Sequence, residues 1–230
     1  MLDSGEGTPQ SKAKARRYIE AGAKAGWAMA ELYWATSVLG VGTPEATAFI
    51  KRAAAQGFAP AEHLLGTSLV TGEGVERNYP EGVEFLRRAA AKGFAQAQVQ
   101  LGIAFNKGIG VDKDYTEAAR WFELAAEQGD ATAQNDLGKI YLNGKGVEQD
   151  HDRAASLFRK AAEQGIPVSM ANLGECYEHG WGVARDRKKA IEWYSKAADK
   201  GFEPALKRIK QCKRGRWLDW LMPTIVVTEG

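Results

Sequence analysis

The chain has 230 residues, of which 44% are hydrophobic and 26% are charged, so it is long enough to bury a large apolar interior as one or two ordinary domains. Its 31 lysines and arginines against 29 acids give a net charge of +2, which excludes a general electrostatic attraction to nucleic acid or anionic membranes. Two cysteines are too few for a disulfide framework and favour a reducing compartment.

The N-terminal segment MLDSGEGTPQSKAKARRYIE carries no export signal. It has no apolar core between its basic residues and no small-residue cleavage site, and no later stretch approaches the roughly 18 uninterrupted apolar residues of a membrane span. We therefore expect a cytoplasmic protein, or a periplasmic or secreted one if the natural N-terminus lies further upstream.

A glycine recurs at a fixed spacing along the chain. The phrases AKAGW, AAQGF, AAKGF, AEQGD, AEQGI and ADKGF place these marker glycines 31, 36, 36, 36 and 36 residues apart, at Gly26, Gly57, Gly93, Gly129, Gly165 and Gly201. A constant period of this length indicates a stack of repeated supersecondary units.

Each unit begins with a segment that we name helix A. Counted from the marker glycine, small residues occupy the second and fourth places, and a Leu-Gly pair occupies the eighth and ninth places in four units. The twelfth place is aliphatic or aromatic in Val38, Leu69, Phe105, Tyr141 and Tyr177. This spacing predicts one apolar face of a helix.

A glycine-rich turn follows helix A and leads into a second helix, helix B. The turns read GEGV, GIGV, GKGV and GWGV; their first glycine suits a left-handed helix C-terminus, and their second allows a close reversal. Three residues after each valine comes a good N-cap for helix B, with Glu81 and Glu117 placed to complete capping boxes; the N-caps are Asn78, Asp114, Asp150 and Asp186. Because a helix precedes each turn and no GxGxxG or GxxxxGK[ST] pattern occurs, we interpret these stretches as turns and not as phosphate loops.

The repeat fixes the expected boundaries. Residues 1–12 are expected to be flexible, and residues 13–26 read as a helix B that has no helix A before it. The unit 27–57 uses LGVGTPEA as a shorter turn, with Thr43 as N-cap and Pro44 in the first helical place. The remaining segments are the repeats 58–93, 94–129, 130–165 and 166–201, a terminal helix over 202–216, and an apolar tail over 217–230.

The pattern AxAxxxLGxxYxxGxGVxxDxxxAxxWxxxAAxxG, clearest from Ala95 to Gly129 and from Ala131 to Gly165, resembles the Sel1-like repeat, a relative of the tetratricopeptide repeat. The resemblance covers roughly residues 13 to 213. It implies an all-α, right-handed superhelical solenoid of about twelve antiparallel helices. Proteins of this kind are mostly bacterial adaptors, signalling regulators, or secretion-linked and host-contact proteins, so it also implies a scaffold for protein–protein interaction.

The titratable residues show no convergent catalytic pattern. His63, His151 and His179 occupy unrelated places of different repeats, and no HExxH, CxxC or GxSxG motif occurs. Cys176 and Cys212 share the eleventh place, but equivalent positions on successive helices A should lie about 8–10 Å or more apart, beyond the reach of a disulfide. We therefore expect two free core cysteines, no metal or other cofactor, and no enzymatic activity.

Recognition of a protein or peptide is the expected function, by a chain that is expected to be monomeric. In related helical-repeat proteins helix A lines the concave surface, and its third, sixth, tenth, thirteenth and fourteenth places face the partner. This predicted helix-A face consists of His63, Thr67, Gln96, Val99, Ile103, Asn106, Lys107, Thr132, Asn135, Lys139, Asn143, Glu175, Glu178 and His179. Its amides, charges and apolar residues suit an extended peptide, and alanine at both Asn135 and Lys139 is expected to weaken binding with the melting temperature nearly unchanged. The alternative is a partner on the convex face or an edge.

The C-terminal end departs from the repeat. Basic residues are dense from Lys207 to Arg216, and Trp217, Leu218, Trp220, Leu221 and Met222 follow. One interpretation is a docking segment for nucleic acid or an anionic membrane, made of Lys213, Arg214, Arg216, Trp217 and Trp220. The preferred interpretation is a cap, because an uncapped solenoid would expose its core. Nucleic acid is accordingly not expected as a partner, and membrane contact is expected only through this tail.

Overall fold

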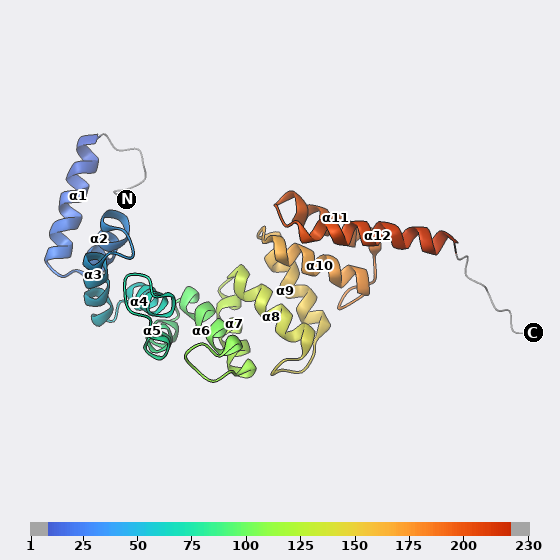
Figure 1. Cartoon of the computed structure of the whole chain (residues 1–230), viewed down its shortest axis with the longest axis horizontal. Helices are drawn as coiled ribbons and strands as arrows, with labels where there is room; N and C mark the ends of the chain where they lie inside the picture. Colours follow the sequence, from blue (N-terminus) through green and yellow to red (C-terminus); the bar gives the residue numbers. More distant parts are fainter. Residues whose placement is uncertain (1–8, 222–230) are drawn as a thin grey trace, which may run out of the picture. The chain divides into compact units, whose positions relative to one another are not determined.

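The structure is a computed structural model that describes the backbone of residues 9–221 and the side chains of residues 13–213. That range consists of helices and turns without a strand, which confirms the all-helical prediction (Figure 1). The elements are α1 (Pro9–Lys24), α2 (Ala28–Trp34), a π-helical turn (Ala35–Leu39), α3 (Pro44–Ala55), α4 (Ala59–Thr71), α5 (Tyr79–Ala91), α6 (Ala95–Lys107), α7 (Tyr115–Glu127), α8 (Ala131–Asn143), α9 (His151–Glu163), α10 (Pro167–His179), α11 (Arg187–Asp199) and α12 (Pro204–Leu221).

The helices form two compact units, residues 1–125 and 126–230. In the first unit each helix from α1 to α5 packs against the next helix in the chain, and in the second unit each helix from α8 to α11 does the same (Figure 1). Helices α2, α4, α6, α8, α10 and α12 are the predicted helices A, and α1, α3, α5, α7, α9 and α11 are the predicted helices B. Each unit is therefore a stack of helical hairpins, as the repeat predicts.

The glycine-rich turns have the predicted conformation. Gly72, Gly108, Gly144 and Gly180 end their helices in the left-handed region, with φ values of 81°, 73°, 62° and 78°. Side chains of the four predicted N-caps accept hydrogen bonds from the first turn of helix B. Thr43 caps α3 in the same way, at 3.2 Å from the Ala46 N–H.

The predicted capping boxes at Glu81 and Glu117 are wrong. The N-cap N–H groups are already used, because Asn78 donates to the Leu69 carbonyl at 2.9 Å and Asp114 donates to the Phe105 carbonyl at 3.0 Å. Asp150 and Asp186 donate to the twelfth-place carbonyls of their own repeats in the same way. This recurring bond ties the start of helix B to the last turn of helix A and leaves no donor for a box.

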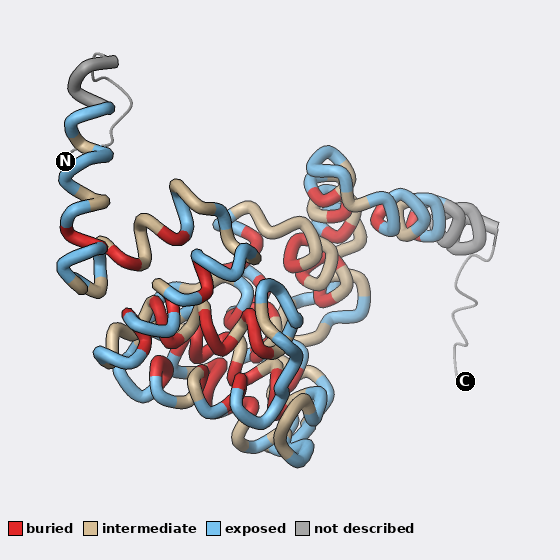
Figure 2. Tube along the Cα trace, turned by 60° about the vertical axis from the view of Figure 1, so that its left-hand side comes forward, coloured by how far each residue is buried: buried red, intermediate tan, exposed pale blue. Residues whose placement is uncertain are grey.

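The Leu-Gly pair allows helix B to approach helix A closely. A β-carbon on Gly102 would lie 2.7 Å from the Phe122 ring, and one on Gly138 would lie 2.7 Å from the Phe158 ring. Both rings are fully buried and have no room to withdraw. Buried residues recur along the packed sides of the helices, and exposed residues line the opposite sides (Figure 2).

A buried polar clamp, which the repeat pattern did not predict, recurs at the fifth place after the marker glycine. Gln56 Nε2 donates to Glu31 Oε2 at 2.9 Å, and Lys92 Nζ donates to Glu62 Oε2 at 2.6 Å. In the second unit the same two places hold glutamines: Gln164 Nε2 donates to Gln134 Oε1 at 2.9 Å. Each bond joins a helix A to the end of the helix B that follows it. We call these pairs the fifth-place clamps.

Both terminal helices extend beyond their expected boundaries. Helix α1 begins at Pro9, inside the segment expected to be flexible, and α12 continues to Leu221, past the expected end at residue 216. The side chains of Arg214, Arg216, Trp217 and Trp220 lie outside the described residues, so the cap and the docking segment stay predictions; Lys213 is exposed. Within the described part of the chain, no helix combines the length and apolarity that crossing a bilayer requires.

Candidate partner-binding face

In the first unit the predicted helix-A face lies on α4 and α6. Gln96 and Lys107 are exposed, and His63, Thr67, Ile103 and Asn106 are half-buried. Val99 is only 6% exposed and belongs to the core. The structure therefore leaves most of this face accessible and places Val99 beneath it.

The two predicted residues on α4, His63 and Thr67, already make contacts within the chain. The Thr67 hydroxyl donates to the His63 carbonyl at 2.9 Å, and the His63 ring packs on the Phe94 ring with centroids 5.2 Å apart. Burial lowers the pKa of His63, because desolvation disfavours the charged imidazolium. In contrast, the side chains of Gln96, Asn106 and Lys107 on α6 make no hydrogen bond or ion pair with any of residues 13–213.

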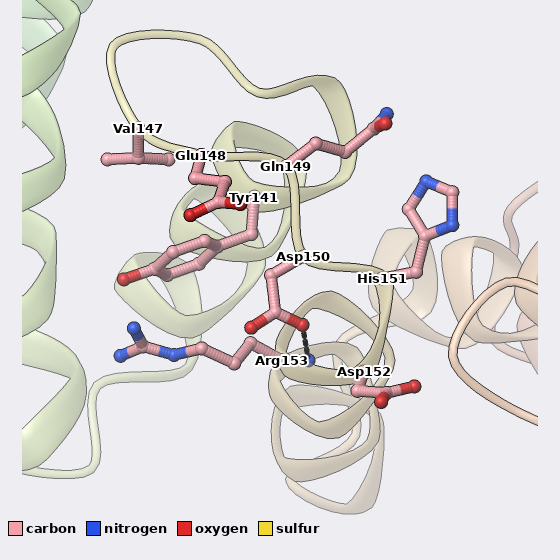
Figure 3. A pocket seen from close by; sticks show the side chains of 8 residues that line it. All are labelled: Tyr141, Val147, Glu148, Gln149, Asp150, His151, Asp152 and Arg153. Atoms are coloured by element: carbon pink, nitrogen blue, oxygen red, sulfur yellow. Dashed lines mark hydrogen bonds between the residues drawn. The ribbon is translucent and has the colours of Figure 1, made fainter.

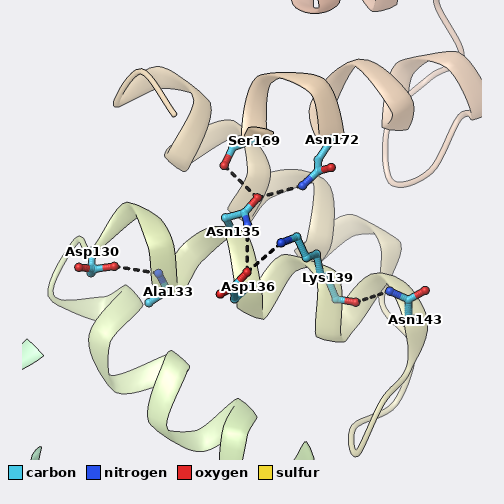
Figure 4. A network of polar contacts seen from close by, with 8 residues as sticks. All are labelled: Asp130, Ala133, Asn135, Asp136, Lys139, Asn143, Ser169 and Asn172. Carbon is cyan, nitrogen blue, oxygen red and sulfur yellow. Dashed lines mark hydrogen bonds and ion pairs between the residues drawn. The ribbon is translucent and has the colours of Figure 1, made fainter. Parts of the chain in front are cut away.

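In the second unit Asn135 is part of a buried polar network (Figure 4). It is 4% exposed, and its side-chain oxygen accepts hydrogen bonds from Ser169 at 3.0 Å and from Asn172 at 2.9 Å, which joins α8 to α10. Its amide group donates to Asp136 at 3.0 Å. The expectation that alanine at Asn135 would leave stability unchanged is therefore wrong, because the substitution removes the acceptor for two neighbouring donors.

We expect Asn135→Ala to lower the free energy of unfolding by about 1–3 kcal/mol, the usual cost of leaving buried polar groups without partners. Urea denaturation followed by circular dichroism measures this loss. The control is Lys139→Ala, since Lys139 is exposed and only pairs with Asp136, at 2.9 Å. An unchanged denaturation midpoint for Asn135→Ala would contradict the structural role assigned to this network.

The other predicted residues of α8 lie at the surface. Thr132, Lys139 and Asn143 are exposed. The Asn143 amide donates to the Lys139 carbonyl at 2.7 Å, so it closes the end of α8 (Figure 4). A partner on α8 would therefore meet Thr132 and the charged pair of Lys139 and Asp136.

Glu175 and Glu178 on α10 are held by the terminal helix. Arg208 of α12 forms a short ion pair with Glu175 and a longer one, 3.6 Å, with Glu178. The Tyr194 hydroxyl donates to Glu178 at 2.7 Å, and burial together with this carboxylate raises the pKa of Tyr194. These acids thus secure α12 against the stack, and a partner at this end would have to displace Arg208.

Two histidines that the sequence assigns to separate elements meet at one tryptophan. The centroid of the Trp181 ring lies 4.5 Å from that of the His179 ring and 6.0 Å from that of the His151 ring. Trp181 is the variable residue of the GWGV turn, so a loop residue brings the end of α10 beside the start of α9. Ring packing of this kind does not make a metal site, and no cluster of three potential metal ligands occurs among the described residues.

A cavity at the start of α9, which His151 helps to line, is formed by side chains that stabilise the fold (Figure 3). Its volume is about 630 Å³, and Tyr141 and residues 147–153 line it. Arg153 lies over the Tyr141 ring at 4.2 Å, and Asp150 caps α9 by accepting the Arg153 N–H at 2.9 Å. The Asp150 carboxylate therefore caps α9 and the Arg153 guanidinium packs on the Tyr141 ring. The cavity offers no nucleophile paired with a base.

Both cysteines are free and buried, as predicted. Burial, with a smaller contribution from the charge of Glu175, raises the pKa of Cys176 to about 12. Burial and Glu178 also raise the pKa of Cys212. Neither thiol therefore has the exposed thiolate character of a nucleophile or redox site.

Comparison with known proteins identifies the family. The model of the Sel1 repeat matches residues 1–27, 59–94, 95–130, 131–166 and 167–202. The chain belongs to the Sel1 repeat family. Residues 28–58 and 203–230 are not matched, and the first of these intervals contains the unit with the shorter turn and the π-helical segment. A search of curated proteins finds no match.

Solved structures of Sel1 repeat proteins resemble the chain. The protein c5321, described as a protective antigen of uropathogenic Escherichia coli, is 37% identical with a TM-score of 0.78; the match covers 84% of this chain and 42% of that protein, so this chain spans less than half of it. A Sel1 repeat protein from Oxalobacter formigenes is 33% identical with a TM-score of 0.75, over 86% of this chain and 83% of that one. A putative Sel1 repeat protein from Klebsiella pneumoniae shares the fold at 20% identity and a TM-score of 0.54, over 85% of this chain and 98% of that one.

Proposed function

We propose that the chain is a non-enzymatic scaffold that binds an extended peptide or protein segment on its helix-A face, with the main contacts on α6. Sel1 repeat proteins are generally protein-interaction scaffolds. The observation that supports α6 is that Gln96, Asn106 and Lys107 carry polar groups that no other residue in the described part of the chain satisfies. A partner that meets these groups breaks no internal bond.

The arrangement on α6 suits a peptide backbone with an acidic side chain. Gln96, Ile103 and Lys107 are seven and four residues apart, so they follow one line along the helix. The amides of Gln96 and Asn106 can both donate to and accept from a peptide backbone, half-buried Ile103 offers an apolar contact, and Lys107 can pair with a carboxylate. Histidines that pack on aromatic rings and buried, protonated cysteines favour a scaffold over an enzyme.

The test is capture of partners by immobilised wild-type chain and by the triple variant Gln96→Ala, Asn106→Ala, Lys107→Ala. We expect the triple variant to retain at least tenfold less of any protein that the wild type retains, with little change in melting temperature, because the three side chains are accessible and uncommitted. The matched control is Lys51→Ala, an exposed lysine on the helix-B side. Equal capture by the triple variant, or an equal loss with Lys51→Ala, would contradict the proposed face.

The alternative proposal is binding of nucleic acid or an anionic membrane by the basic C-terminal tail. Salt distinguishes the two functions. A tail with about six phosphate contacts would lose affinity steeply as salt rises, whereas a peptide held by amides and one apolar contact would be far less sensitive.

A further inference from the structure

In the groove between α3 and α5, a leucine stands where the later repeats carry an aromatic ring. The twelfth place after the marker glycine is Leu69 in α4, but Phe105 in α6 and Tyr177 in α10. A cation of the preceding helix B contacts each of these rings. The guanidinium of Arg87 lies 5.5 Å from the centroid of the Phe105 ring. In the second unit Arg159 donates to the Tyr177 hydroxyl at 3.3 Å.

Lys51 of α3 is the equivalent of these two arginines, and it has no ring to contact. All three cations stand six places before a marker glycine. Lys51 is exposed, and its side chain makes no hydrogen bond, ion pair or ring contact with any of residues 13–213. The aliphatic side chain of Leu69 offers this ammonium no aromatic face. The first unit therefore has the cation of the recurring pair without its ring.

A cavity of about 680 Å³ lies between Lys51 and Leu69. Leu65 and Leu69, only 3% and 6% exposed, form its apolar floor, and half-buried Val75 and Phe85 extend this floor. Cavities of roughly 300–1,000 Å³ are typical of small-molecule sites, and an apolar one of about 150 Å³ already binds benzene. The cavity therefore has room for an aromatic ring and a polar head group.

The rim of the cavity carries charges of both signs; they are Lys51, Glu76, Arg77, Glu81 and Arg88. Arg88 is held by the buried carboxylate of Glu62 at 2.8 Å. Glu81 accepts a hydrogen bond from the Asn78 amide at 2.9 Å. Because three cations stand beside two acids, the net charge of the rim is too small to select either an anion or a cation. A ligand that itself carries both charges matches this rim best.

Two of the rim charges that stay available are adjacent in the turn before α5. Arg77 uses one N–H group on the Thr71 carbonyl, at 2.8 Å, and its guanidinium has further donors. The Glu76 carboxylate is exposed and makes no hydrogen bond or ion pair with any of residues 13–213. A carboxylate can therefore pair with Arg77, and an ammonium with Glu76, without breaking an ion pair of the fold.

We propose that the cavity between α3 and α5 binds a free aromatic amino acid. The ring of the ligand lies on Leu65 and Leu69 and takes the ammonium of Lys51 on its face. Its carboxylate pairs with Arg77, and its ammonium pairs with Glu76. None of the lining residues belongs to the predicted helix-A face, so this site is separate from the function proposed above.

The probes are 5-fluoro-L-tryptophan and two analogues that each lack one charge, 5-fluorotryptamine and 5-fluoroindole-3-propionate. Fluorine NMR titrations with the full chain give the three dissociation constants, since only the ligands carry fluorine. We expect the amino acid to bind at least tenfold more tightly than either analogue, because it alone engages both Arg77 and Glu76. No binding of the amino acid, or equal binding of either analogue, would overturn the proposal.

The decisive variant is Leu69→Phe, which supplies the ring that α6 has at this place. We expect it to weaken the amino acid at least tenfold and to keep or raise the melting temperature, because it fills a cavity. Glu76→Gln, at an exposed residue, tests the site without a change in the core. It should bind the amino acid no more tightly than the wild type binds the propionate.

The matched control is Lys107→Ala, at an exposed lysine of the helix-A face in the same unit, and it should leave the affinity for the amino acid unchanged. Circular dichroism checks the fold of all three variants. Undiminished binding by a folded Leu69→Phe variant, or by Glu76→Gln, contradicts the proposed site. A loss of binding with Lys107→Ala would place the ligand on the helix-A face and would overturn the proposal as well.

Discussion

Alanine at Gly182 is expected to destabilise the second unit by about 3 kcal/mol or more. Gly182 has φ +64°, where an L-residue other than glycine costs about 1–2 kcal/mol. Its β-carbon would in addition overlap the backbone carbonyl of His151 at the start of α9, and overpacking of this kind costs about 1–3 kcal/mol. A backbone carbonyl cannot rotate away as a side chain can, so the turn or the helix has to move.

The matched control for Gly182→Ala is Gly201→Ala in the same unit. Gly201 has φ +85°, but apart from its two chain neighbours no residue of the described part of the chain lies within 4 Å of the position of its β-carbon. Only the backbone strain remains, so a loss of about 1–2 kcal/mol is expected. Urea denaturation of both variants separates the conformational cost from the steric cost. Equal losses would show that the close contact between the turn and α9 contributes nothing.

Removal of Arg88 and Lys92, the two cations that pair with Glu62, should lower the free energy of unfolding more than any other surface change in the first unit. The Glu62 carboxylate is fully buried, with Arg88 2.8 Å from one oxygen and Lys92 2.6 Å from the other. Arg88→Met with Lys92→Met leaves a buried charge without a partner, and we expect a loss of about 3 kcal/mol. This is the lower end of the usual range, because both cations are partly exposed.

A third substitution tests the cause of that loss. The chain itself has methionine in the fifth place of a later repeat, where Met170 is 6% exposed. Adding Glu62→Met to the double variant removes the unpaired charge, so most of the lost stability should return. Thermal denaturation of the wild type, the double variant and the triple variant completes the comparison. If the triple variant is as unstable as the double variant, the loss arises from packing of the two long side chains and not from the charge.

The fold could be read from the sequence because its signals are local and repeated. The marker glycines, the GxGV turns and the N-caps each act within a few residues. They recur from repeat to repeat, so the helix bounds could be predicted from the sequence. The fifth-place clamps were not predicted, because glutamate and glutamine are common residues on exposed helix faces. The paired changes, Glu62 with Lys92 and Gln134 with Gln164, were the available signal.

The binding face could be predicted only in part, because the exposure of a side chain depends on the residues of the adjacent repeat. Asn135 and His63 share the sixth place, yet Asn135 is enclosed by Ser169 and Asn172 while His63 packs on Phe94. The place of Glu175 in its repeat predicts an available carboxylate, but α12 brings Arg208 into an ion pair with it. The repeat pattern predicts the same role for every residue at a given place. The contacts of a side chain depend on its neighbours, and these differ from one repeat to the next.

The most direct test of the scaffold function is carbene footprinting of the chain, alone and with a captured partner, read by mass spectrometry. We predict that labelling falls at Gln96, Asn106 and Lys107 of α6 when the partner is bound and stays constant at the exposed lysines of the helices B, such as Lys51 and Lys160. Unchanged labelling of α6, with protection confined to the helices B, would contradict the assignment of the helix-A face as the binding surface.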